Sequence, residues 1–273
     1  MKYILALGSV DRRVLYVLLA VVLVLPLVRP IGLPISIRDN SKQVYDKIDE
    51  LKPGARVIMD INYDVSAIAD IESQAVAILN HLLDKDAKVI AISFVPQGPI
   101  IADRLLGRWL EAGKEYGKDF CNLGYLAGGE TAMNAFIRDL PKACPSDYMG
   151  SPVSSLEVMN GIRSGADADL LIYFSSSYTA EWIRQAGPLD VPIIAGVITV
   201  LGPAQEAFVQ SGQLKGLLVG MRGGAEYELM IRKPGPAVAA MDAQSMGHML
   251  FILFIVFGNM AYLSEKNKRA KRS

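Results

Sequence analysis

The sequence is poor in the residues on which many enzyme mechanisms depend. Its 273 residues include only two histidines, His81 and His248. The first lies in a segment with helical hydrophobic spacing and the second in a long apolar run, so neither suits the base of a Ser-His-Asp triad. Two histidines so far apart also give no basis for a histidine-ligated metal site. We therefore expect no metal and assign no catalytic residue.

Nucleotide-binding motifs are missing as well. There is no Walker A sequence, and Gly220-Met221-Arg222-Gly223-Gly224 has the wrong spacing and place for a GxGxxG turn. The charges balance at 28 basic against 28 acidic residues, which excludes the basic footprint of a nucleic-acid-binding protein. We expect no cofactor and no nucleic-acid partner.

Cysteine is scarce. Cys121 and Cys144 lie 23 positions apart, a spacing that fits neither a CxxC redox motif nor a zinc site. In an oxidising compartment the two thiols could form a disulfide, and in the cytosol they would be buried free thiols. The sequence leaves both alternatives open.

Apolar residues, in contrast, are abundant, and the first long run lies near the N-terminus. Residues 14–28 carry no charge, and after Arg29 a second apolar stretch covers 31–35. A helix that crosses about 30 Å of hydrocarbon needs about 20 residues, so the run predicts a transmembrane helix over 14–34 with Arg29 at the interface. A cleavable signal peptide is the alternative. The following residues, RPIGLPIS, lack the small residues of a cleavage site, which favours a retained span.

A second apolar run covers residues 246–263. Only His248 and Asn259 are polar in these 18 residues, and a basic tail follows over 264–273. The core helix of a soluble domain would show a polar face, whereas 250–257 is apolar on every side. We predict a second transmembrane helix over 246–263, preceded by a linker over 237–245.

Basic residues near the spans predict the orientation of the chain. Eight lysines and arginines lie on the terminal sides of the two spans, and five lie on the other side within about 15 residues. Because the cytoplasmic side carries the excess of basic residues, we expect 1–13 and 264–273 in the cytoplasm. The region over 35–236 is then extracytoplasmic at the plasma membrane, with the lipid bilayer as the first partner.

Between the spans, short apolar runs alternate with segments of helical spacing. The predicted strands cover 56–61, 88–95, 119–125, 170–174, 191–200 and 214–219. The predicted helices cover 40–51, 71–83, 99–116, 130–140, 154–163, 177–185, 203–210 and 226–230. Near-continuous apolar strands separated by helices predict a three-layer, doubly wound α/β domain with a mostly parallel sheet of about five to six strands.

Polar and glycine residues follow the predicted strands, where a parallel sheet of this kind binds ligands. The ligand-binding candidates are Asn62, Asp64, Gln97, Gly98, Gly128, Gly129, Glu130, Thr131, Ser175, Ser176, Ser177, Arg222 and Glu226. Backbone donors at helix N-termini would suit an anionic or polar small molecule. The alternative is that these residues only form the turns that any such sheet needs. A pairing of Asp60 with Asp64 could perform acid–base chemistry, although Asp60 in an apolar strand more often accepts a structural hydrogen bond.

These features lead to three functional hypotheses. The first is a non-enzymatic two-span membrane protein whose central domain mediates assembly or protein binding, with further copies of the chain or other membrane proteins as partners. Tethering at both ends raises the local concentration for such lateral contacts. The second is a domain that binds or senses a small molecule at the strand ends. The third is a membrane-bound hydrolase or transferase that uses Asp64, Glu130 or the serines from Ser175 to Ser177.

Overall fold

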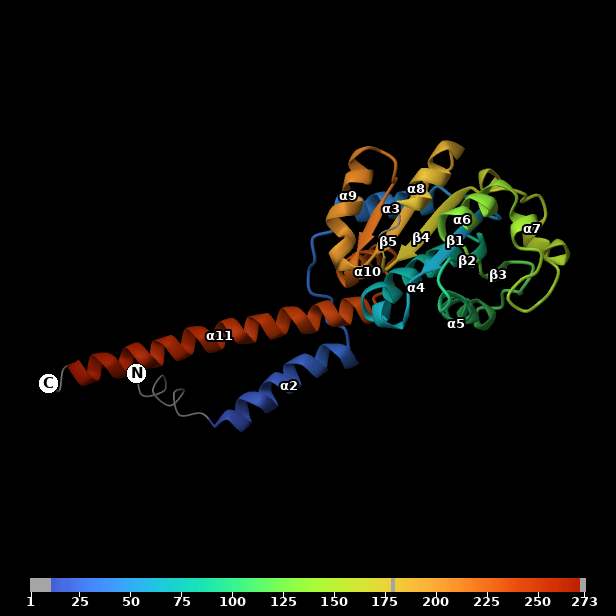
Figure 1. Cartoon of the computed structure of the whole chain (residues 1–273). Coiled ribbons are helices and arrows are strands. Elements are labelled where there is room, and N and C mark those ends of the chain that lie inside the picture. The colour runs from blue at the N-terminus through green and yellow to red at the C-terminus, as the bar shows by residue number, and fades with distance from the viewer. Residues whose placement is uncertain (1–10, 178–179, 271–273) are drawn as a thin grey trace. The chain divides into compact units, whose positions relative to one another are not determined.

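The computed structural model describes residues 11–177 and 180–270 and divides into two compact units. One unit comprises Ile35–Lys233 and contains an α/β domain (Figure 1). The other comprises the residues before Ile35 and after Lys233, and its described residues include two helices.

A six-stranded sheet, parallel at every strand pair, forms the centre of the domain, as the apolar runs predict. Each predicted strand is confirmed to within a few residues, because fully buried parallel strands are recognisable as short apolar runs. The strands are β1 (Arg56–Asn62), β2 (Lys88–Ser93), β3 (Phe120–Tyr125), β4 (Leu170–Ser175), β5 (Ile193–Val197) and β6 (Leu217–Val219). Their order in the sheet is β3-β2-β1-β4-β5-β6.

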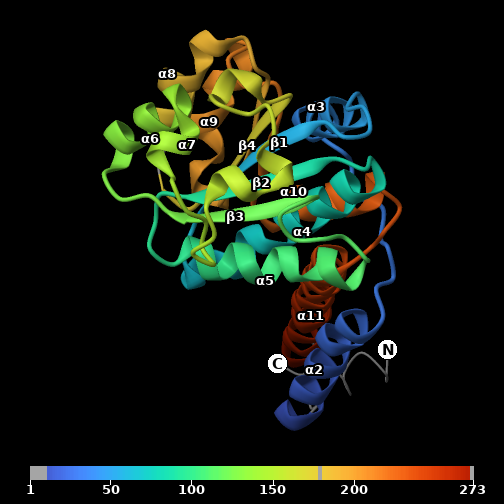
Figure 2. The same cartoon turned by 90° about the vertical axis from the view of Figure 1, so that its right-hand side faces the viewer.

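Helices cover both faces of this sheet (Figure 2). One face packs against α3 (Asp39–Asp49), α4 (Ile68–Asp84), α5 (Gly98–Glu111) and α10 (Gly220–Met230). The other packs against α6 (Gly129–Arg138), α7 (Leu140–Ala143), α8 (Glu181–Ala186) and α9 (Gly202–Gln210). Each face has its own apolar core, centred on residues such as Trp109 and Tyr227 on the first face and Phe136 and Trp182 on the second. The doubly wound arrangement is therefore confirmed.

The strand order creates one special position in the sheet. β1 and β4 are neighbours, yet the chain leaves β1 towards α4 on one face and leaves β4 towards α8 on the other face. The two connections diverge at the carboxyl ends of the strands. In doubly wound sheets this switch point is where ligands bind.

Helix α10 begins six residues before the predicted range 226–230, and α5 ends five residues before the predicted end at 116. Two further predicted helices differ more strongly from the structure. Residues 154–163 do not form one helix but two short 3-10 turns, Val153–Ser155 and Glu157–Met159, in a segment bounded by Pro152 and by Gly161 at a φ of 82°. The helix predicted over 177–185 begins only at Glu181, with Ala180 as its N-cap. Residues 178 and 179 lie outside the described residues.

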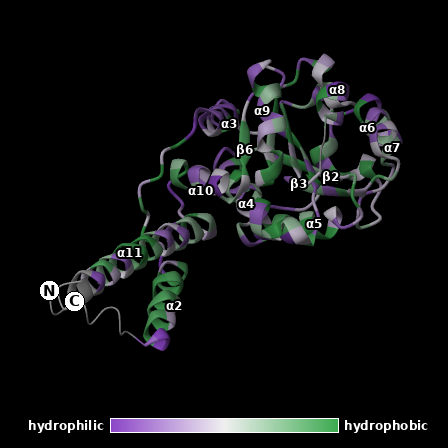
Figure 3. Ribbon diagram, turned by 60° about the vertical axis from the view of Figure 1, so that its left-hand side comes forward, coloured by the Kyte–Doolittle hydropathy of each residue, from purple (hydrophilic) through white to green (hydrophobic). Residues whose placement is uncertain are grey.

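In the other unit, α11 (Pro236–Ala270) is the one helix of the described residues that is long and apolar enough to cross a membrane, over Pro236–Ser264. It includes the predicted span over 246–263, and the expected linker over 237–245 belongs to the same helix. Figure 3 shows hydrophobic residues along both α2 and much of α11. The N-terminal helix α2 (Arg12–Val28) has 17 residues and ends before the expected boundary at residue 34. Pro30, Gly32 at a φ of 73°, and Pro34 end the helix there.

A buried carboxylate joins these two helices. Asp242 of α11 accepts hydrogen bonds from the backbone N–H groups of Ile31, Gly32 and Leu33, at 2.7, 2.7 and 2.8 Å. Five residues further along α11, a Cβ atom on Gly247 would lie 3.0 Å from Leu23 of α2. Later positions of α11 thus meet earlier positions of α2. The two helices form an antiparallel hairpin.

Candidate ligand site at the carboxyl ends of the strands

At the switch point, polar side chains gather on one face of the sheet. Side chains alternate along a strand, so Asp60 and Asn62 of β1 share the face on which Ile58 packs into the core with Trp182. Their neighbours in β4 are Tyr173, beside Asp60, and Ser175, beside Asn62. A carboxyl, an amide, a phenol and a hydroxyl group thus replace the aliphatic side chains of the earlier part of the two strands.

Asp60 is fully buried, and only one of its two carboxyl oxygens has a hydrogen-bond partner among the described residues. Its Oδ2 atom accepts a hydrogen bond of 2.6 Å from the indole Nε1 of Trp182 on α8, while Oδ1 has no partner among the described residues. Burial raises the pKa of Asp60 to about 8, against the smaller lowering effect of the indole hydrogen bond. At neutral pH the carboxyl group is therefore mainly protonated.

Two further buried polar atoms on this face lack a partner among the described residues. They are Oδ1 of Asn62 and Nε2 of Gln205, a fully buried residue of α9. The other end of the Gln205 amide is held, because the Tyr173 hydroxyl donates to its Oε1 atom at 2.7 Å. A buried polar atom without a partner costs about 1–3 kcal/mol. Three of the eight buried side-chain atoms without a partner among the described residues thus belong to this cluster, which makes it a candidate ligand site.

The serine run predicted from the sequence borders this cluster. Ser175 closes a tight turn, since its hydroxyl donates to the Ser177 carbonyl at 2.7 Å and accepts from the Ser177 N–H at 3.1 Å. The N–H of Ser176 donates to the carbonyl of Asn62 at 3.3 Å. The structure thus brings Asn62, Ser175 and Ser176 together, whereas the Ser177 side chain is exposed.

The other candidates that follow β1 and β2 have roles within the chain. Asp64 caps the turn before α4, where its carboxylate accepts from the N–H and hydroxyl of Ser66 at 2.8 and 2.6 Å, and these bonds lower its pKa. Gly98 is required for packing, because a Cβ atom there would lie 1.8 Å from the Ser93 hydroxyl. Gln97 is exposed.

The candidates that follow β3 lie on the surface of α6. Gly128 and Gly129 adopt positive φ angles of 120° and 55°, and Thr131 is exposed. Glu130 forms two hydrogen bonds of 2.9 Å with the guanidinium of Arg184 and one with Gln185, and these contacts lower its pKa to about 2. Glu130 therefore joins α6 to α8.

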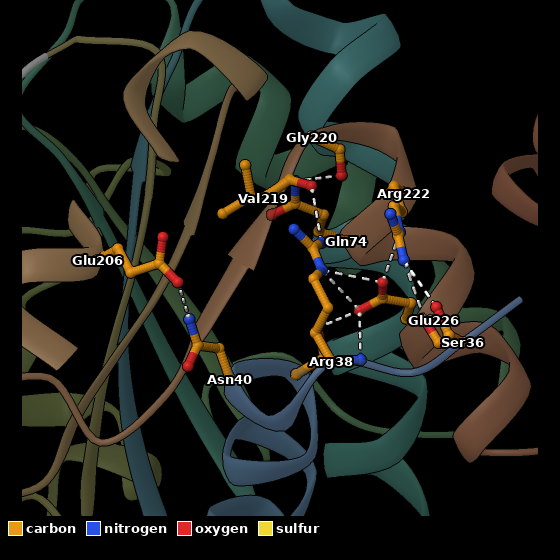
Figure 4. Close-up of polar contacts among 10 residues, drawn as sticks. Ser36, Arg38, Asn40, Gln74, Glu206, Val219, Gly220, Arg222 and Glu226 are labelled. Carbon is orange, nitrogen blue, oxygen red and sulfur yellow. Dashed lines mark hydrogen bonds and ion pairs between the residues drawn. The ribbon is translucent and has the colours of Figure 1, made fainter. Parts of the chain in front are cut away.

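Arg222 and Glu226 belong to a separate cluster beyond β6 (Figure 4). The buried carboxylate of Glu226 accepts from Nε of Arg38 and Nε of Arg222, each at 2.9 Å, and from the Ser41 hydroxyl at 2.5 Å. Arg222 also donates to the carbonyl of Ser36 at 3.2 Å. This cluster, which we call the Glu226 clasp, ties the segment before α3 to α10 and has no unused hydrogen-bonding atom on Glu226.

Two residues of the switch-point cluster, Trp182 and Gln205, were not singled out from the sequence, and Asp60 was considered only as an acid–base partner of Asp64 or as a structural acceptor. We interpreted Asp60 as a structural acceptor, and the structure shows it with a single donor. Trp182 and Gln205 lie in predicted helices, and nothing in their spacing distinguishes them from core residues. The one signal in the sequence was the carboxylate within the apolar run over 56–61.

Both cysteines are free thiols in the structure. Burial raises the pKa of Cys144 to about 11 and that of Cys121 further above its usual value. The Cys121 sulfur lies 3.9 Å from the Met159 sulfur. In the structure both thiols therefore act as core side chains.

Within residues 11–177 and 180–270, no three histidine, cysteine, aspartate or glutamate side chains gather where they could hold a metal ion. The chain matches no protein-family model, and no curated protein is significantly similar to it.

Proposed function

We propose that this chain is a two-span membrane protein whose α/β domain binds a small polar molecule between the carboxyl ends of β1 and β4. The observation that carries this proposal is the unpaired Oδ1 atom of the buried Asp60, together with the unpaired atoms of Asn62 and Gln205 on the same face. A ligand that pairs with these atoms would recover the free energy that their burial costs the unliganded fold.

The antiparallel hairpin of α2 and α11 supports the membrane part of the proposal. Helix α2 spans about 26 Å at 1.5 Å per residue, slightly less than the hydrocarbon core, and arginines lie at both of its ends. Most of its large apolar side chains are exposed, as they would be against lipid. A two-pass hairpin places both termini on one side of the membrane, which the basic residues indicate to be the cytoplasm.

The ligand proposal is tested with the full-length protein in detergent. Small polar molecules are screened by their effect on the melting temperature and on the fluorescence of Trp182, with a Trp109→Phe variant to remove the second indole. A ligand of the crevice raises the melting temperature and changes the emission, since Trp182 donates to Asp60. If no compound does so, or if Asp60→Leu, which removes both oxygens of the carboxyl group, binds each of them as well as the native chain, the binding proposal is wrong.

The hairpin is tested with paired cysteines in membranes. Leu23→Cys and Gly247→Cys together should form a disulfide on mild oxidation, because these positions meet between α2 and α11. Each single variant is the control, and the buried Cys121 and Cys144 remain in place. If the pair fails to cross-link while the protein remains membrane-bound, α2 does not pair with α11 as proposed.

Assembly through the membrane hairpin is a second candidate function. It is favoured by an open apolar groove along α2, lined by Ala20, Val21, Val24, Leu25 and Val28. A second copy of the hairpin would fit such a surface in the membrane plane. Size-exclusion chromatography with mass measurement of the detergent-solubilised protein tests the assembly hypothesis. If the protein is a monomer, that hypothesis is wrong.

The hydrolase or transferase hypothesis has less support from the geometry. Asp64 and Glu130 are both engaged with partners in the chain, and Ser175 forms its own turn. A double variant, Asp64→Ala with Glu130→Ala, should keep ligand binding, and this separates the second hypothesis from the third.

A further inference from the structure

The unpaired atoms at the switch point are of mixed kind, and this restricts the chemistry of a ligand. Oδ1 of Asn62 accepts hydrogen bonds, whereas Nε2 of Gln205 donates them. The Trp182 indole donates to Oδ2 of Asp60, so when Asp60 is protonated its proton lies on Oδ1 and this atom is a donor. A partner that pairs with all three atoms must therefore both donate and accept hydrogen bonds.

Two features of the surroundings disfavour an anionic ligand. Asp64 occupies the first turn after β1 with its own carboxylate, where a doubly wound fold would bind a phosphate. The nearest guanidinium on α8, that of Arg184, is paired with Glu130, and Arg222 is paired with Glu226. A phosphate would therefore find the first turn after β1 already occupied by a carboxylate and both of these arginines already paired.

An amine fits the unpaired atoms no better. An ammonium group only donates, so it leaves the Gln205 amide and the protonated Asp60 without an acceptor. Burial holds Asp60 mainly neutral at pH 7, so Asp60 offers an amine no counter-charge. A hydroxyl group, in contrast, donates and accepts at the same oxygen atom.

We propose, resting on the binding function above, that the ligand is a neutral molecule that presents hydroxyl groups, such as a sugar or a polyol. Asn62 accepts from one of its hydroxyls, and Asp60 and Gln205 donate to others. This assigns the crevice between β1 and β4 to neutral polyhydroxyl compounds in preference to their phosphates and amines.

The experiment compares matched compounds on the full-length protein in detergent by titration calorimetry. The probes are neutral sugars and polyols (glucose, mannose and myo-inositol), their monophosphates, and the amino sugars glucosamine and mannosamine. We expect binding by at least one neutral probe, about tenfold or more tighter than by its charged derivatives. Titration in two buffers of different ionisation enthalpy should show no proton release, because Asp60 stays protonated.

Variants locate the site. Asn62→Leu should weaken binding of that neutral probe about tenfold or more without making the protein easier to unfold, because the deleted oxygen has no partner in the chain. Gln205→Leu should weaken it similarly, and the matched change on the exposed end of the same helix, Gln210→Leu, should leave binding unchanged.

The outcomes separate the two proposals. Tighter binding of a phosphate or an amino sugar overturns the ligand class, and the binding function stands. Unchanged affinity in both Asn62→Leu and Gln205→Leu also overturns the assignment to these residues. If no probe of any class binds and the wider screen is empty, the binding function itself fails.

Discussion

Three buried carboxylates of this protein can be compared directly. Glu226 accepts from two arginines and a serine, and Asp242 accepts from three consecutive backbone N–H groups. Asp60, although equally buried, has one donor and one oxygen without a partner. The first two join segments that lie about 190 and 210 positions apart in the chain. The Asp60 side chain forms a single hydrogen bond within the described part of the chain, with Trp182 of α8, and lies near the carboxyl end of the central strand β1.

The difference shows how a structural carboxylate is distinguished from one available to a ligand. A saturated carboxylate contributes its hydrogen bonds to the fold, and its removal leaves several donors unpaired. An unsaturated one costs the fold stability, so its removal should cost little and affect binding most.

The largest effect on stability is expected at Glu226. Glu226→Gln leaves the guanidinium groups of Arg38 and Arg222 without a counter-charge, and because both are partly exposed we expect a loss of about 2–3 kcal/mol. Urea unfolding of the detergent-solubilised protein, followed by tryptophan fluorescence, measures it. Glu206→Gln is the control, since Glu206 is exposed and accepts a single bond from Asn40. Equal stability of the two variants would contradict the role of the Glu226 clasp.

The next effect is expected at Asp242. Asp242→Ala leaves three amide donors of residues 31–33 unpaired and should loosen the hairpin by about 2 kcal/mol. The readout is the yield of the disulfide between cysteines at positions 23 and 247, which should fall. Asp242→Asn keeps one acceptor oxygen and should give an intermediate yield. An undiminished yield in the Ala variant would show that the packing of the helices alone holds the hairpin.

The free energy of unfolding should depend on pH through the titration of Asp60. Its pKa is 3.8 in the unfolded chain and about 8 in the folded one, so the folded state binds the extra proton between these values. The stability contributed by the protonated group is complete below pH 3.8 and is lost as pH rises through 8. Native protein should therefore lose about 1 kcal/mol per pH unit between pH 6.5 and 7.5 relative to Asp60→Asn, which does not titrate. If the difference in unfolding free energy between the native protein and Asp60→Asn is the same at pH 6.5 and at pH 7.5, the pKa of Asp60 is not raised.

The smallest effect is expected at Asp64. Asp64→Ala removes the cap of the turn before α4 and should lower the melting temperature only slightly, since the group is exposed. Binding at the crevice should be unchanged. A large loss of binding would instead show that Asp64 contributes to the ligand site.

The parallel sheet could be predicted from the sequence almost completely, because six short apolar runs have few alternatives to buried strands. The helix expected over 154–163 shows the limit of such patterns. Val158 and Ile162 have helical spacing and are both buried, but they are buried from turns and not from one helix. Hydrophobic spacing reports burial, and only the backbone decides between a helix and a series of turns.

The candidate site was harder to predict. Polar residues after a strand were easy to identify, yet Glu130, Arg222 and Glu226 are engaged in ion pairs whose partners are distant in the sequence or on the same helix. Asp60 lies inside a strand, and its unpaired oxygen depends on what α8 and α9 bring to that face. Hydrogen-bond satisfaction is a property of the folded surroundings, so residue type and spacing alone do not reveal it.

The contact of Asp242 with three successive amides has a mechanical consequence. A shift of α2 along α11 by one helical turn, about 5.4 Å, would break all three bonds together. Rotation of α2 about its own axis would carry Gly32 and its neighbours off the carboxylate as well. Sliding and rotation of one helix against the other are thereby opposed, so the two helices should move together as one rigid body.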